Sequence, residues 1–146
     1  MIPKLLVFFQ FIGIALVILS GRVIPSGYAY FAISSLGVIL GLWAIFEQKP
    51  GNFNITPTNK SGARFVTKGP YKYIRHPMYL AIIIAFVPLI IDHYNTWRLL
   101  SGFFLLIVLI IKLEYEEKKL MKQFAGYNEY KRRSWKILPP VYWLQI

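Results

Sequence analysis

The chain has 146 residues, of which 56% are hydrophobic and 16% charged, and its formal net charge is +11 at pH 7. A soluble domain of this size would struggle to bury so much apolar surface, and the basic residues lie between apolar blocks, which argues against nucleic-acid binding. The absence of cysteine excludes disulfides, thiolate metal ligands and cysteine nucleophiles. Composition therefore indicates a single membrane domain over residues 1–146.

Four apolar segments are separated by polar breaks. They are residues 5–19, 28–46, 77–91 and 97–113. The first follows Lys4 and resembles a secretory signal, but no convincing small-residue cleavage site follows it, so we interpret it as a retained transmembrane helix. The breaks at 20–27 and 92–95 are short and contain turn-forming residues. We therefore predict two helical hairpins, over residues 1–46 and 77–113.

The third segment is short, and a long polar linker precedes it. At about 1.5 Å per residue it spans about 22 Å, less than the hydrocarbon core of about 30 Å, and Pro88 should kink it. The linker at 47–76 contains turn sequences such as Lys49-Pro50-Gly51-Asn52, so it belongs outside the hydrocarbon. A loop of this length often carries function.

The last part of the chain, residues 114–146, is charged. Within it, residues 114–130 predict a helix, because an apolar stripe with helical spacing includes Leu120, Phe124 and Tyr127. Aromatic side chains nearby suit the membrane interface. They are Trp135, Tyr142 and Trp143. The predicted fold class is all-α and polytopic, with four transmembrane helices as two hairpins and a C-terminal amphipathic helix.

Basic residues predict the orientation of the chain. Fifteen of the seventeen lysines and arginines fall near the N-terminus, in the linker or in the tail from Lys112, whereas only Arg22 and Arg98 lie in or beside the two short breaks. By the positive-inside rule, the termini and the linker are cytoplasmic. Four crossings place all three on the same side, so segment number and charge agree.

A basic, aromatic stretch stands where the linker meets the third segment. The proline after His76 disfavours helical geometry for the histidine, and Pro77 suits the first turn of a helix. The chain should therefore bend at the membrane surface. We expect Tyr71, Arg75 and Tyr79 to converge with His76 at this bend.

Several pieces of the second half occur in a characteristic order. They are Arg75-His76-Pro77-Met78-Tyr79, an apolar hairpin, Glu116-Glu117, Phe124, and Tyr127-Asn128-Glu129-Tyr130. In this order the chain resembles the isoprenylcysteine carboxyl methyltransferases and the related phospholipid methyltransferases. The resemblance covers about residues 65–140 and places a catalytic core at about 63–140.

The resemblance implies methyl transfer from the cofactor S-adenosylmethionine. It also implies a set of cofactor-binding residues: Arg64, Phe65, Val66, Tyr71, His76, Pro77, Met78, Tyr79 and Glu116. A basic residue one turn before the first glutamate faces the substrate, and here it is Lys112. Eukaryotic members carry arginine there and histidine at Ala63. Lysine keeps the charge but lacks the two-pronged geometry of arginine.

The chemistry of the residues is compatible with this transfer. Glu116 can meet an ammonium or ribose hydroxyls, and Arg75 or His76 can meet a carboxylate. The tyrosines can cover a sulfonium or adenine. Transfer to a carboxylate of a lipidated or hydrophobic acceptor is a direct displacement in which alignment supplies most of the catalysis. We therefore assign Lys112, Arg75 and Glu117 as candidate catalytic residues.

Other interpretations remain open. An amine headgroup acceptor would need a base, for which His76 or Glu117 is a candidate, and a thiol acceptor is a third option. A membrane reductase using a nicotinamide cofactor shares a related C-terminal pattern, and a non-catalytic scaffold could bind anionic lipid. Lys112 and Glu116 can be a mere surface pair, and Glu117 can be structural. No Gly-x-Gly-x-x-Gly, phosphate loop, nucleophile elbow or metal-ligand run occurs, so we expect no metal site.

Overall fold

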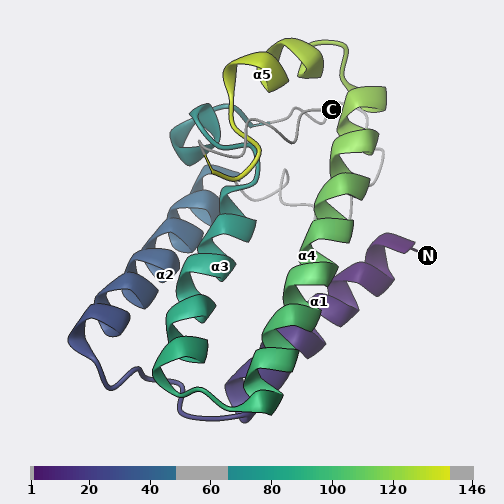
Figure 1. The fold of residues 1–146 in the computed structure, drawn as a ribbon. Coiled ribbons are helices and arrows are strands. Elements are labelled where there is room, and N and C mark those ends of the chain that lie inside the picture. Colours follow the sequence, from purple (N-terminus) through teal and green to yellow (C-terminus); the bar gives the residue numbers. More distant parts are fainter. Residues whose placement is uncertain (1, 49–65, 139–146) are drawn as a thin grey trace.

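A computed structural model describes residues 2–48 and 66–138, and these residues are helical apart from short connections (Figure 1). The elements are α1 (Ile2–Leu19), α2 (Tyr28–Gln48), a 3-10 turn η1 (Gly69–Lys72), α3 (Pro77–Asp92), α4 (Thr96–Gln123) and α5 (Tyr127–Arg133). The predicted all-α class is confirmed. The linker turns within 49–65 and the aromatic residues after 138 lie outside the described residues.

Three helices are long and apolar enough to cross a membrane: α1, α2 and α4. The third apolar segment forms α3, which has 16 residues and spans about 24 Å. It begins at Pro77, as predicted, and His76 before it has non-helical backbone angles. The chain is therefore a multi-pass membrane protein whose shortest apolar helix does not match the hydrocarbon core of about 30 Å.

The helices pair differently from the predicted hairpins. The most extensive contacts join α2 to α3 and α1 to α4, and α3 touches α4 less (Figure 1). Gly37 explains the first pairing, because a Cβ there would lie 2.5 Å from the backbone nitrogen of Ala85. The Ser34 hydroxyl also donates to the Ala85 carbonyl at 3.0 Å. Hydropathy locates the helices, but it does not show which faces meet.

The fourth helix does not end where the sequence predicted. We expected a boundary near residue 113, but α4 continues to Gln123 and is 28 residues long. Residues 103–123 contain neither glycine nor proline, so nothing interrupts the helix where the apolar residues give way to charged ones. The break comes at Phe124, which is extended, and the C-terminal helix α5 is only seven residues long.

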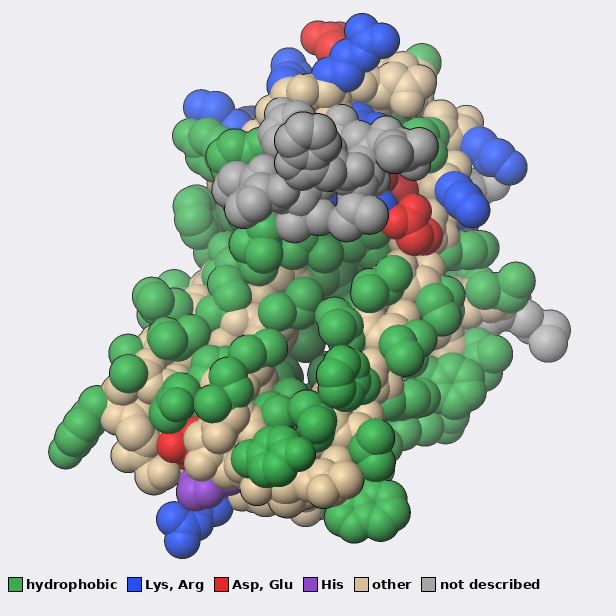
Figure 2. Space-filling model, in the orientation of Figure 1, with side chains coloured by type: hydrophobic (Ala, Val, Ile, Leu, Met, Phe, Trp, Pro, Cys, Tyr) green, Lys and Arg blue, Asp and Glu red, His purple; other side chains and the backbone are tan. Residues whose placement is uncertain are grey.

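The two short connections are joined to each other at one end of the molecule. The backbone N–H of Ser26 donates to Asp92 Oδ2 at 2.7 Å. The buried side chain of Arg98 donates to the carbonyl of Arg22 at 2.6 Å. The opposite end holds η1, α5, the first turn of α3 and the last turns of α4, and we call it the site end. The basic side chains gather mainly there, above helices covered by apolar side chains (Figure 2).

Candidate functional site

The segment before α3 is held by the chain that follows α5. Ile74 and Trp135 form an isolated parallel bridge, in which Trp135 N–H donates to the Tyr73 carbonyl at 2.8 Å. The N–H of Arg75 donates to the Trp135 carbonyl at 2.7 Å. Backbone pairing of two segments about 60 residues apart thus fixes the backbone positions from which the side chains of Arg75 and His76 extend.

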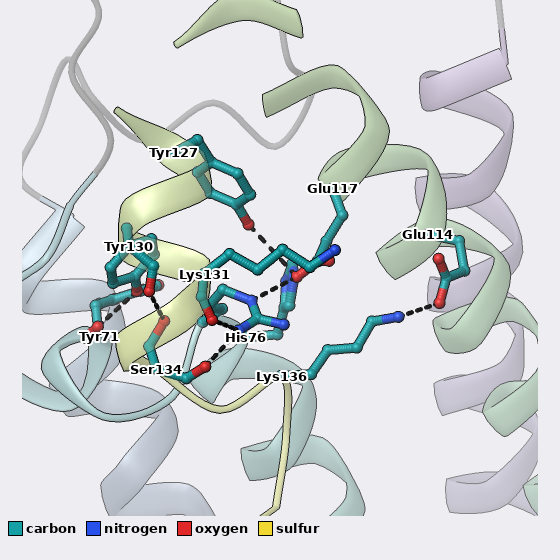
Figure 3. Close-up of polar contacts among 10 residues, drawn as sticks. Tyr71, His76, Glu114, Glu117, Tyr127, Tyr130, Lys131, Ser134 and Lys136 are labelled. Carbon is teal, nitrogen blue, oxygen red and sulfur yellow. Dashed lines mark hydrogen bonds and ion pairs between the residues drawn. The ribbon is translucent and has the colours of Figure 1, made fainter. Parts of the chain in front are cut away.

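A buried ion pair lies directly beneath this backbone pairing. Arg75 Nε donates to Glu117 Oε1 at 2.7 Å, and the two side chains are only 1% and 4% exposed. His76 Nε2 lies 3.2 Å from the same oxygen, and the Tyr127 hydroxyl points toward it at 3.5 Å (Figure 3). Arg75 Nη1 donates to the carbonyl of Lys131 at 3.0 Å and to that of Ser134. Glu117 therefore ties the last turns of α4 to the bend before α3 and to α5.

The tyrosines of α5 complete this cluster. The Tyr130 hydroxyl donates to the Tyr71 carbonyl at 2.5 Å, and the Ser134 hydroxyl donates to the Tyr130 carbonyl at 2.5 Å (Figure 3). Burial raises the pKa of Tyr130 and of Tyr127, and for Tyr127 the charge of Glu117 adds to the effect. Both phenols consequently remain neutral and keep their protons for hydrogen bonding.

A second group of polar side chains lies beside the ion pair. Lys112 Nζ is 3.8 Å from Glu116 Oε1 and 5.3 Å from the centroid of the Tyr79 ring. The Glu116 carboxylate lies close to the hydroxyls of both Tyr71 and Tyr79. Burial raises the pKa of Tyr71 to about 12; a hydrogen bond from Gln48 opposes the shift and the charge of Glu116 adds to it. The Tyr71 hydroxyl is therefore protonated at neutral pH.

Most of the site residues predicted from the sequence lie together in the structure. Those found together at the site end are Tyr71, Arg75, His76, Tyr79, Lys112, Glu116 and Glu117. Pro77 and Met78 form the first turn of α3, and Val66 is half-buried ahead of η1. Arg64 and Phe65 lie outside the described residues. The convergence at the bend is confirmed, whereas the chemical roles stay predictions.

Two glutamines join this group that the sequence analysis did not single out. Gln48, the last residue of α2, donates to the Tyr71 hydroxyl at 2.9 Å. Gln10 of α1 accepts from Lys112 Nζ at 2.7 Å. Each stands in or at the end of an apolar helix, where a polar side chain needs a partner. That signal could have marked both residues, although it could not have named their partners.

The carboxylates of the two groups differ in exposure and in their partners. The Glu117 side chain is 4% exposed and bonded to Arg75, whereas the Glu116 side chain is 22% exposed, contacts the Tyr79 hydroxyl and has its ion-pair partner Lys112 3.8 Å away. Beside Glu116 lie the aromatic rings of Tyr71 and Tyr79. Within residues 2–48 and 66–138, no three His, Asp or Glu side chains gather as metal ligands. The second group is thus suited to a ligand with positive charge and a flat ring.

Comparison with known proteins gives a family match. The model of the isoprenylcysteine carboxyl methyltransferase (ICMT) family matches residues 30–122, more than half of the chain. The matched region contains α3, the bend before it and all of α4 except Gln123. It therefore includes the ion pair of Arg75 with Glu117 and the neighbouring Lys112 and Glu116.

Two curated proteins are similar to parts of the chain. The uncharacterized protein YpbQ of Bacillus subtilis (strain 168) is 34% identical over 113 residues, which cover 76% of this chain and 56% of that protein. Methanethiol S-methyltransferase 2 of Bradyrhizobium diazoefficiens is 31% identical over 88 residues, which cover 58% of this chain and 32% of that protein. The matches thus span about half or less of these relatives. No solved structure matches significantly.

Proposed function

The chain belongs to the isoprenylcysteine carboxyl methyltransferase family, whose members use S-adenosylmethionine, and we propose that it transfers a methyl group to a hydrophobic acceptor in the membrane. One observation carries the proposal. The bend before α3 and the acidic pair on α4 meet, with His76 Nε2 3.2 Å from Glu117 Oε1. These are the pieces whose order resembles the family, and they converge on one site.

The residues beside this contact fit the cofactor chemically. S-adenosylmethionine carries an ammonium, a carboxylate, a sulfonium and an adenine ring. Glu116 is the more exposed of the two acidic neighbours and can accept hydrogen bonds from an ammonium or from ribose hydroxyls. Tyr71 and Tyr79 can offer aromatic faces to the sulfonium or adenine, and His76 can donate to the carboxylate. Glu117 and Arg75, which already form a buried ion pair, would position these residues.

When bound, the cofactor would supply a methyl group on a positively charged sulfur. An acceptor oxygen or sulfur would bond to the methyl carbon while the carbon–sulfur bond breaks, and S-adenosylhomocysteine would leave. The protein has to hold the acceptor in line and exclude water, which needs no general base for an ionised acceptor. The Lys112 side chain, on the apolar helix α4, is 11% exposed. Its ammonium would attract the negatively charged group of the acceptor to a position next to the cofactor.

The leading acceptor class is a carboxylate on a lipidated or hydrophobic molecule. A thiol is the second candidate, because the relative from Bradyrhizobium diazoefficiens is named for methanethiol. Both acceptors react as anions, so Lys112 would serve either. Lys112→Ala should raise KM for the acceptor about tenfold or more and change cofactor affinity less than about twofold. A large loss of cofactor affinity would contradict this role.

Ligand-induced thermal stabilisation tests the cofactor assignment. S-adenosylhomocysteine should raise the melting temperature of the detergent-purified protein, and NADPH should not. His76→Ala and Glu116→Gln should each weaken binding while the protein remains folded. Glu129→Gln is a matched control, because Glu129 pairs with Arg133 on the exposed face of α5. Stabilisation by NADPH alone would favour the reductase interpretation.

Transfer of a tritiated methyl group tests the reaction itself. The acceptors to compare are a prenylcysteine, a long-chain fatty acid, an aminophospholipid and an alkyl thiol. We expect transfer to the carboxylates or the thiol and loss of transfer in Glu116→Gln. If the wild-type protein neither binds S-adenosylhomocysteine nor methylates any of these acceptors, the proposal is wrong and a lipid-binding scaffold becomes the better interpretation.

A further inference from the structure

Lys112 has two possible partners, and it is bound to the neutral one. Its ammonium donates to Gln10 Oε1 at 2.7 Å, whereas the nearest oxygen of Glu116 is 3.8 Å away. A separation of 3.8 Å exceeds hydrogen-bond length. The ammonium is therefore held by an amide on α1, although a carboxylate of opposite charge lies one turn along its own helix.

The position of Gln10 is fixed by close helix packing. Residue 10 lies within the apolar helix α1, where an unpartnered polar side chain would be costly. Gly13, one turn later, lets α1 approach α4, because a Cβ there would lie 3.1 Å from Leu105 Cβ. Lysine can only donate, so the amide oxygen must face it. Gln10 also lies outside the residues that the family model matches, so α1 adds a site contact of its own.

We propose that Gln10 is a positioning residue that prevents the Lys112 ammonium from forming a direct hydrogen bond with Glu116. The carboxylate then stays available to S-adenosylmethionine, and the ammonium stays available to the acceptor. The inference rests on the proposed function. Without the amide, the flexible lysine side chain would move onto Glu116, because an ion pair shielded from water is strong. The cofactor would then have to compete with Lys112 for the carboxylate.

Binding of S-adenosylhomocysteine to the full chain in detergent tests this role without an acceptor. Gln10→Met has the shape of glutamine but no oxygen, and it should weaken binding about tenfold. Lys112→Met alone should change the affinity less than about twofold. The double variant should regain nearly wild-type affinity, because no ammonium is left to occupy Glu116. Gln10→Glu should bind the ligand normally, since its carboxylate retains the lysine.

Ser35→Ala is the matched control, because Ser35 is a polar residue of the apolar helix α2 whose hydroxyl donates to Phe31 O in its own helix. It should leave the affinity unchanged. Melting temperatures without ligand separate folding defects from binding defects. If Gln10→Met does not fold, Gln10→Asn, whose amide is too short to reach Lys112, carries the same expectation.

Two results would overturn the inference alone. One is unchanged S-adenosylhomocysteine affinity in Gln10→Met, and the other is a defect that persists in the double variant with Lys112→Met. Failure of the wild-type protein to bind S-adenosylhomocysteine would instead contradict the proposed function, and the inference with it. Since the outcomes differ already in the wild-type protein, the two failures are distinguishable.

Discussion

Glu116 and Glu117 are neighbours in the sequence but occupy different environments. Because they lie about 100° apart around α4, Glu117 turns into the cluster with Arg75 and Glu116 turns toward Lys112 and the tyrosines. The sequence predicted that Glu116 shares a cofactor site with residues of the bend before α3, and both glutamates lie near that bend. It assigned Glu117 a candidate catalytic role, yet the geometry gives it a bonding pattern suited to holding the site together.

Breaking the buried pair should therefore destabilise the fold. Glu117→Gln would leave the Arg75 guanidinium without its countercharge, and we expect a loss of about 3–5 kcal/mol in the free energy of unfolding. Chemical denaturation in detergent measures it. Arg133→Ala breaks the exposed pair with Glu129 and should have almost no effect. Equal effects of the two substitutions would show that burial of the first pair is unimportant.

Burial of Tyr71 predicts a dependence of stability on alkaline pH. Its pKa is raised to about 12 in the folded protein and is about 10 when unfolded. The unfolded state therefore releases the proton first, so the stabilising contribution is complete below about pH 10 and is lost as the pH rises toward 12. Tyr71→Phe should reduce the fall in melting temperature over this interval. An identical fall in both proteins would contradict the assignment.

At the scale of elements, the sequence located helices better than it located their partners. Breaks such as Pro77 are visible as residue types, so the start of α3 was predicted correctly. The continuation of α4 past residue 113 was missed because a change from apolar to charged residues is not a helix end. Pairing of α2 with α3 depends on the close approach of the two helices at Gly37. The spacing of Gly37 and Gly41 is common in membrane helices, so it does not by itself show which helix packs there.

Gly37 should be far less tolerant of substitution than Gly41. A Cβ at Gly37 would lie 2.5 Å from the nitrogen of Ala85 and 2.8 Å from the carbonyl oxygen of Ala81, so Gly37→Ala must push α2 and α3 apart. We expect a loss of about 1–3 kcal/mol in the free energy of unfolding. Gly41→Ala places its Cβ 3.4 Å from Ala81 Cβ, an ordinary contact, and should be nearly neutral. The same denaturation experiment compares them.

At the scale of the whole molecule, orientation in the membrane remains a prediction. The site end carries exposed basic residues, including Lys122 on α4 and Arg132 on α5, and the positive-inside rule places it in the cytoplasm. The chain contains no cysteine, so single cysteines can report accessibility. Lys122→Cys should react with an impermeant maleimide only from the cytosolic side, and Tyr94→Cys only from the other. The reverse pattern would invert the topology.

The site could be predicted only in part. The order of the motifs along the chain was enough to assign His76, Glu116 and Lys112 to one site, because each residue belongs to a recognisable motif. Contacts such as Lys112 with Gln10 join residues 102 positions apart, and the backbone pairing of Ile74 with Trp135 leaves no residue-type signature. Such contacts follow from the way α1 packs on α4 and the chain after α5 returns, which no local pattern encodes.

The shortness of α3 has a consequence for where the two substrates can meet. Because this helix spans about 24 Å and the apolar slab is about 30 Å, Tyr79 near its start is carried below the headgroup level unless the bilayer thins around the protein. The water-soluble cofactor and the proposed hydrophobic acceptor would then meet at one depth, between the aqueous phase and the centre of the bilayer. The acyl-chain length of the lipids would therefore change the depth at which the two substrates meet, and a thicker bilayer would place the reaction further from water.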